Sequence, residues 1–260
     1  MNLTVYQVDA FAEKVFEGNP AAVVPLTEWL PDATMQKMAM EHNLSETAFF
    51  VKEDDCYHIR WFTPEAEVDL CGHATLATAH VMFRHLAYSS ESICFKSRSG
   101  NLSVKKEGDL LVLNFPASEV EAKYIPTGLK TAFGIHPQEC FKGREDLMLV
   151  FKSENDIINL QPNFSLMLES TSRGIICTAK SEKYDFVSRF FAPSVGIDED
   201  PVTGSAHTML IPYWAKQLDK TTLVAKQVSK RGGVLECKHL DERVEIGGKA
   251  QTYMIGNIDI

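Results

Sequence analysis

The sequence has no Cys-x-x-Cys pair, no cluster of basic residues and no apolar N-terminal stretch of signal length. Its six cysteines stand singly, at positions 56, 71, 94, 140, 177 and 237, which predicts reduced thiols rather than a disulfide framework or a zinc site. Lys and Arg total 26 against 35 Asp and Glu, and a net charge of −9 disfavours nucleic acid or an anionic membrane surface as a partner. Without a signal peptide we expect a cytoplasmic protein.

What the chain does contain is typical of a folded protein that stays in water. It has 260 residues, of which 45% are hydrophobic and 23% charged. That length exceeds the usual size of one domain and fits two domains of about 120–130 residues.

An internal repeat supports two halves. Three segments of the first half have counterparts in the second at nearly constant offsets, which indicates two pseudo-equivalent domains with a crevice between them as the expected site. The pairs are Arg60–Pro64 with Arg189–Pro193 at an offset of 129, and Gly72–Thr75 with Gly204–His207 and Ser97–Gly100 with Ser229–Gly232 at an offset of 132.

The expected fold class is α+β, with two pseudo-symmetric domains, each a strand-rich, barrel-like sheet wrapped round a central helix. The helix that begins at Gly72 is apolar on most of its circumference, as a helix buried on all sides would be. We place the domains at 1–117 and 118–260. In the second half we expect strands near 165–168, 174–178 and 185–191, then a helix from about Gly204 that is kinked or broken at Pro212.

Gly72 and Gly204 are candidate substrate-binding residues. Each precedes a helix, so two helix N-termini with free N–H groups would form a site for a substrate carboxylate. An isolated glycine at a helix start is usually structural, but the repeat favours a functional role.

Glu46 and His73 are candidate catalytic residues. Glu46 lies between a helix end and an apolar strand, where partial burial would let it act as base and as acid, although most glutamates are solvated. His73 stands at a helix start, whose dipole should disfavour the imidazolium form and keep the ring neutral. A capping or core histidine is the plain alternative.

The remaining candidates are Asp200 as a catalytic residue, and Ser205 and Asn19 as substrate-binding residues. Asp200 precedes Pro201 and is equally suited to a turn, Ser205 to a helix start and Asn19 to a tight turn. Arg60 and Arg189 repeat, and a paired structural role suits them at least as well as ligand binding. We expect no metal site and no nucleotide site.

Five ordered motifs, which span almost the whole chain, resemble the phenazine-biosynthesis PhzF-like isomerase family. The resemblance implies a diaminopimelate-epimerase-like fold, commonly a homodimer, and cofactor-free proton transfer within a small cyclic carboxylic acid such as trans-2,3-dihydro-3-hydroxyanthranilate. The family's catalytic glutamate matches Glu46, its histidine matches His73, and its further polar site residues match Asp200 and Ser205. The motifs are Phe16–Ala21, Asn43–Phe49, Arg60–Thr75, Asp200–His207 and Gln227–Gly233.

Two other hypotheses are kept open. One is an amino-acid racemase or epimerase of the same fold, which would use a cysteine at each helix start. Cys71 suits the first position, but the offset of 132 places Thr203 at the second, and threonine cannot supply a thiolate. The other is a binding module without turnover, which loss of Glu46 or of the glycines would have indicated.

Overall fold

The computed structural model describes residues 1–169 and 172–260, which form two compact units. The first unit comprises Met1–Asn114 and Ile246–Ile260, and the second Phe115–Glu245. The predicted division after residue 117 falls near this one. It differs at the C-terminus, because strand β18 (Ala250–Asp259) pairs antiparallel with β1 (Asn2–Ala10) and so belongs with the first unit. No helix in the described ranges has the length and apolar character needed to span a membrane.

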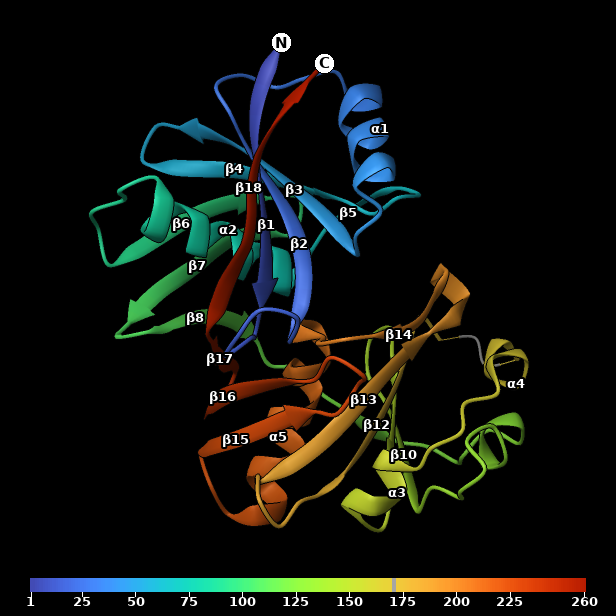
Figure 1. Ribbon diagram of the computed structural model, residues 1–260. Coiled ribbons are helices and arrows are strands. Elements are labelled where there is room, and N and C mark those ends of the chain that lie inside the picture. Colours follow the sequence, from blue (N-terminus) through green and yellow to red (C-terminus); the bar gives the residue numbers. More distant parts are fainter. Residues whose placement is uncertain (170–171) are drawn as a thin grey trace. The chain divides into compact units, whose positions relative to one another are not determined.

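In the first unit, strands surround helix α2 (Gly72–His85), in teal in Figure 1. Most of this helix is buried, and it packs against β1, β2, β3 and β18. The remaining elements are β2 (Asn19–Leu26), α1 (Asp32–His42), β3 (Glu46–Glu53), β4 (Cys56–Phe62), β5 (Glu67–Val68), β6 (Ser92–Ser97), β7 (Gly100–Glu107) and β8 (Leu110–Pro116).

In the second unit the central helix is α5 (Gly204–Leu218). Its Trp214 stacks on Phe186 and donates a hydrogen bond to Thr178 on a neighbouring strand. The other elements are β9 (Glu121–Ala122), η1 (Gly128–Lys130), β10 (Glu139–Lys142), β11 (Leu147–Val150), α3 (Glu154–Ile158), α4 (Phe164–Leu168), β12 (Ile175–Lys180), β13 (Phe186–Ala192), η2 (Pro193–Val195), β14 (Ile197–Asp200), β15 (Thr222–Gln227), β16 (Gly233–Leu240) and β17 (Arg243–Gly248).

The two units repeat one strand topology. In the first, β1–β2 is antiparallel, β2–β3 parallel, β3–β4 antiparallel, β4–β6 parallel and β6–β7 antiparallel. The series β10, β11, β12, β13, β15 and β16 alternates in the same order. In each unit the central helix stands in the crossover that joins the last parallel pair. This confirms the predicted α+β fold with two strand-rich repeats round a helix.

Arg60 and Arg189 are equivalent structural residues. Arg60 donates from Nε and Nη2 to the two carboxylate oxygens of Glu67, both at 2.7 Å, and Arg189 binds Glu199 in the same way at 2.7 and 2.9 Å. Each guanidinium also lies over a phenylalanine two residues further along its own strand. These ion pairs connect the short strand β5 to β4 in the first unit and the short strand β14 to β13 in the second.

One local prediction was wrong, and a second was wrong in part. The strand expected near 165–168 is helix α4, which begins after Asn163 because the Asn163 side chain accepts a hydrogen bond from the N–H of Leu166. At Pro212 we expected a kink or a break, and there is no break, because helix α5 continues through that residue. Proline frees the carbonyl four residues earlier, and that Thr208 oxygen accepts a hydrogen bond of 3.0 Å from the N–H of Ser118 instead.

The prediction of reduced thiols was wrong for one pair. Cys56 on β4 and Cys94 on β6 form a disulfide, with Cα atoms 4.8 Å apart. They stand side by side because β4 and β6 are parallel neighbours in which Tyr57 is aligned with Phe95. The other four cysteines are free and buried. A separation of 38 residues across a helical crossover leaves no local spacing from which such a pair can be read.

Candidate active site

The start of helix α2 brings three candidate residues together. Cys71 is the N-cap residue, in an extended conformation, and its side chain makes no capping bond within the described chain. Gly72 follows as the first helical residue, so backbone N–H groups remain open at this end. His73 comes next and is buried, with 4% of its surface exposed.

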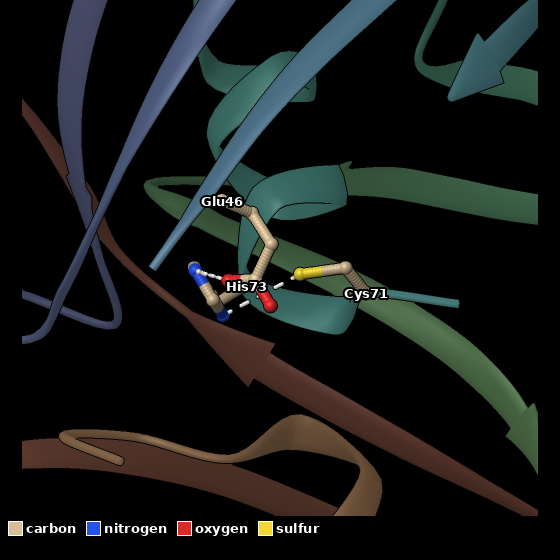
Figure 2. A group of neighbouring side chains, drawn as sticks. All are labelled: Glu46, Cys71 and His73. Carbon is tan, nitrogen blue, oxygen red and sulfur yellow. Dashed lines mark hydrogen bonds and ion pairs between the residues drawn. The ribbon is translucent and has the colours of Figure 1, made fainter. Parts of the chain in front are cut away.

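Glu46, the first residue of β3, faces His73 (Figure 2). Strand β3 pairs in parallel with β2, which brings the turn before it close to the beginning of β2. The Glu46 Oε2 atom lies 3.0 Å from His73 Nε2. Both atoms are buried, and apart from this ion pair neither has a hydrogen-bond partner among the described residues. A buried carboxylate and imidazole paired in this way form a site at which a proton can be taken up or released.

The other ring nitrogen of His73 has two neighbours. Asn19 Nδ2 lies 3.1 Å from His73 Nδ1, and Cys71 Sγ lies 3.6 Å from the same atom. Ser45 Oγ in turn donates to Asn19 Oδ1 at 3.2 Å. Asn19, the first residue of β2, is completely buried. The sequence motifs around Asn19, Glu46 and His73 thus meet at one place in the first unit.

Burial and charge set the protonation of this group. Burial and the Glu46 carboxylate raise the pKa of the Cys71 thiol to about 11, so it is neutral near pH 7. Burial lowers the pKa of His73, but the Glu46 carboxylate raises it, and it lies well above the ordinary value. The expected neutral ring is therefore corrected, because a carboxylate at 3.0 Å outweighs the helix dipole.

Glu46, Cys71 and His73 each offer a ligand atom, and these atoms lie within 4.8 Å of one another. The arrangement is not that of one metal centre, because Glu46 faces Nε2 of the ring whereas Cys71 faces Nδ1. A single ion takes only one of the two nitrogens of a histidine.

In the second unit, Asp200 is held at the start of α5. Thr203 is the N-cap residue, and its Oγ1 donates a hydrogen bond to Asp200 Oδ2. Gln227, completely buried, donates from Nε2 to the Asp200 carbonyl at 2.7 Å and accepts from the Thr203 N–H at 2.9 Å. Gln227 was not predicted as a site residue, although it opens one of the five motifs.

Ser205, the second residue of α5, has a charged neighbour that the sequence did not indicate. Arg173 Nη2 lies 3.4 Å from Ser205 Oγ and binds the buried carboxylate of Asp146 at 2.6 Å. Burial lowers the pKa of Arg173, but the hydrogen bond that Arg173 donates to Asp146 and nearby charges, including Asp200, raise it above its usual value. No motif surrounds Arg173, so nothing in the sequence singles it out.

Within its unit, each predicted site residue therefore lies at the start of the central helix. Asn19, Glu46, Gly72 and His73 gather at α2, and Asp200, Gly204 and Ser205 at α5. Asp9, near the end of β1, accepts a hydrogen bond from the N–H of Phe16 in the loop that follows.

Two strand-rich repeats, each round a central helix, with a paired acid and imidazole at one helix start, define a protein of the epimerase-like fold class. A hydroxyproline epimerase from Agrobacterium vitis has this fold, with a TM-score of 0.65 and 8% identity over 99% of this chain and 92% of that one. The sequence profile of the phenazine biosynthesis-like proteins matches residues 8–256.

Closer relatives give the family. An uncharacterized isomerase of Pseudomonas aeruginosa is 52% identical over the full length of both chains. The crystal structure of a PhzF-family phenazine biosynthesis protein from Enterococcus faecalis has a TM-score of 0.97 and 49% identity, again over the whole of both chains. The chain belongs to the PhzF-like family and is an isomerase, as its motifs predicted.

Proposed function

We propose that this isomerase moves a proton within a small cyclic carboxylic acid, without a cofactor, in a reaction similar to that of trans-2,3-dihydro-3-hydroxyanthranilate isomerase. Glu46 is the acid–base residue, and His73 is its partner. One observation carries the proposal: Glu46 Oε2 and His73 Nε2 are buried and form an ion pair at 3.0 Å, and neither has another hydrogen-bond partner among the described residues.

The chemistry needs one carboxylate used twice. Glu46 takes a proton from a carbon that the substrate's unsaturated carboxylic acid makes acidic, and the electron pair moves into the conjugated system. The neutral Glu46 then returns the proton to another carbon of that system. No atom is lost and nothing is oxidised, so no redox partner is required. The positive His73 beside it stabilises the carboxylate form before and after the transfer.

The other predicted residues take binding roles in this proposal. The open N–H groups at Gly72 and Gly204 are suited to a carboxylate, since both N-cap side chains leave them uncapped in the described parts of the chain. Asp200 and Ser205 are suited to polar groups on the ring. The thiol-based alternative is disfavoured, because Cys71 and Thr203 occupy the same N-cap position and only the first is a thiol.

We also propose that the protein is a cytoplasmic homodimer. An exposed apolar group on the first unit supports self-association: the Phe16 side chain lies edge-on to Tyr253, with Met254 and Ile255 beside it on β18. Light scattering should give twice the chain mass, and Ile255→Lys should shift the mass toward the monomer. A monomeric parent would contradict this part of the proposal.

The substrate class is tested by offering unsaturated cyclic carboxylic acids and, in parallel, L-amino acids to the enzyme in D₂O. Proton NMR should show a shifted double bond and one incorporated deuterium with a cyclic acid. Glu46→Gln should abolish the change, whereas Glu53→Gln, on the same strand but partly exposed, should not. Epimerised amino acids with unchanged cyclic acids would favour the racemase alternative.

A further inference from the structure

Four polar side chains form a continuous chain beside α2. Ser45 Oγ donates to Asn19 Oδ1, Asn19 Nδ2 lies against His73 Nδ1, and His73 Nε2 faces Glu46 Oε2. Ser45 is the residue directly before Glu46. The series of contacts therefore begins at Ser45, passes through Asn19 and His73, and ends at the carboxylate of Glu46.

The Asn19 amide can serve either protonation state of the ring. With Nδ2 toward the ring, the amide can donate to the unprotonated Nδ1 of a neutral ring, whose proton then lies on Nε2, toward Glu46. Rotated by half a turn, the amide would present Oδ1 as acceptor to the Nδ1–H of an imidazolium. Ser45 Oγ both donates and accepts, so it remains bonded to Asn19 in both orientations.

Other groups that face the ring are less suited to this role. Glu46, from β3, acts on Nε2, and Cys71, before α2, is the second neighbour of Nδ1 at 3.6 Å. A neutral thiol is only a weak hydrogen-bond donor. Asn19 is thus the stronger partner of Nδ1, and its complete burial prevents water from taking its place.

We propose that Asn19, held by Ser45, is a positioning residue that governs which nitrogens of His73 carry protons beside Glu46. Its effect on turnover rests on the proposed function, whereas its effect on the ring does not. The amide lets His73 gain or lose a proton without leaving a buried nitrogen unpaired. The geometry that carries this inference is the pair of contacts on opposite sides of one amide, at 3.1 and 3.2 Å.

The test is a ¹⁵N NMR titration of the histidine rings in the full-length protein, with the His73 signals assigned by their loss in His73→Gln. Asn19→Asp can only accept at Nδ1, so the ring should stay charged to a pH higher by about one unit or more. Asn19→Leu, of similar size, should lose the single preferred tautomer of the neutral ring. Ser45→Ala keeps the Asn19 amide. It should change the tautomer ratio of neutral His73 in the same direction as Asn19→Leu does, but by less.

Thr252→Val is the matched control, because Thr252 contacts His80 and His85 at 2.9 and 2.7 Å. It should alter those two rings and leave His73 unchanged. Wild-type His73 signals throughout the titration of Asn19→Asp, Asn19→Leu and Ser45→Ala would overturn the inference. Failure of every cyclic acid to react with the wild-type enzyme would instead contradict the proposed function and leave the ring titration intact.

Discussion

At the start of α2 the chain reads Cys71, Gly72 and His73, whereas at the start of α5 it reads Thr203, Gly204 and Ser205. Both N-cap residues are extended, and both helices open on a glycine. The backbone of the two starts is therefore alike, whereas Cys71 and His73 of the first unit are matched by Thr203 and Ser205 in the second. The repeat conserves the open N–H groups and leaves the side chains free to diverge.

The carboxylates differ in the same way. Phe49 is aligned with Arg60 on the neighbouring strand, and Cys177 is aligned with Arg189 in the same way. Phe49 and Cys177 are therefore equivalent. Three residues before them lie Glu46 in the first unit and Gly174 in the second. A Cβ on Gly174 would lie 2.2 Å from the buried ring of Phe190 and 3.0 Å from Asp146. The second unit thus has no room for an acid at the place of Glu46. The candidate carboxylate of the second unit is instead Asp200. The offset of 132 places Val68 at the equivalent position in the first unit.

The largest expected effect concerns these two carboxylates. Glu46→Gln should lower kcat by ~10²–10⁴, because general acid–base catalysis is lost. Asp200→Asn should lower kcat/KM by only about 10–100-fold, the loss of a hydrogen bond to a charged group. Turnover of one cyclic acid by both variants at matched folded concentration measures the difference. Equal losses would mean that the units share the acid–base work.

The second prediction compares His207 with Thr75, its equivalent on α2. Both side chains donate to the carbonyl of the N-cap residue. Burial lowers the pKa of His207 to about 4. The unfolded chain therefore binds an extra proton between about pH 6.5 and 4, and stability falls as the pH falls through that window. The full cost is about 3 kcal/mol.

Urea unfolding of the wild type and His207→Gln from pH 7 to pH 4 tests this second prediction. The variant should lose less stability on acidification than the wild type does. Parallel pH curves for the two proteins would refute the assignment. His80, also with a pKa of about 4, is present in both proteins and cancels in the comparison.

The third prediction concerns the paired arginines. Arg189→Met should destabilise the protein by about 2 kcal/mol, because it leaves Glu199 largely buried without this partner. Arg60→Met should cost less, since Arg98 Nη2 still lies 2.6 Å from Glu67. The free energy of unfolding in urea measures both. A larger cost for Arg60→Met would show that Arg98 does not support Glu67.

The smallest effect is expected at Cys71. Its thiol is neutral near pH 7, so Cys71→Ala should keep activity within about tenfold and cost on the order of 1 kcal/mol of stability. A kinetic assay and a urea curve on one preparation measure the two effects. A folded but inactive variant would revive the thiol mechanism.

The sequence predicts most where the repeat or a motif covers the residue. The offset of 132 places Cys71 and Thr203 at equivalent helix starts, and the motifs identify Glu46 and His73. Contacts between distant segments are not predicted. Ser118 supports α5 past Pro212, and Cys56 meets Cys94 across a parallel crossover. The charge of His73 depends on how close Glu46 comes, and only the three-dimensional arrangement gives that distance.

The central claim is that a carboxylate of the first unit, and not a thiol, moves the proton. The most direct test is the exchange of the substrate's acidic hydrogen for deuterium in D₂O, followed by mass spectrometry, with Glu46→Gln and Cys71→Ala at matched folded concentration. We expect exchange by Cys71→Ala within about tenfold of the wild-type rate and none above background by Glu46→Gln. Exchange by Glu46→Gln together with none by Cys71→Ala would contradict it.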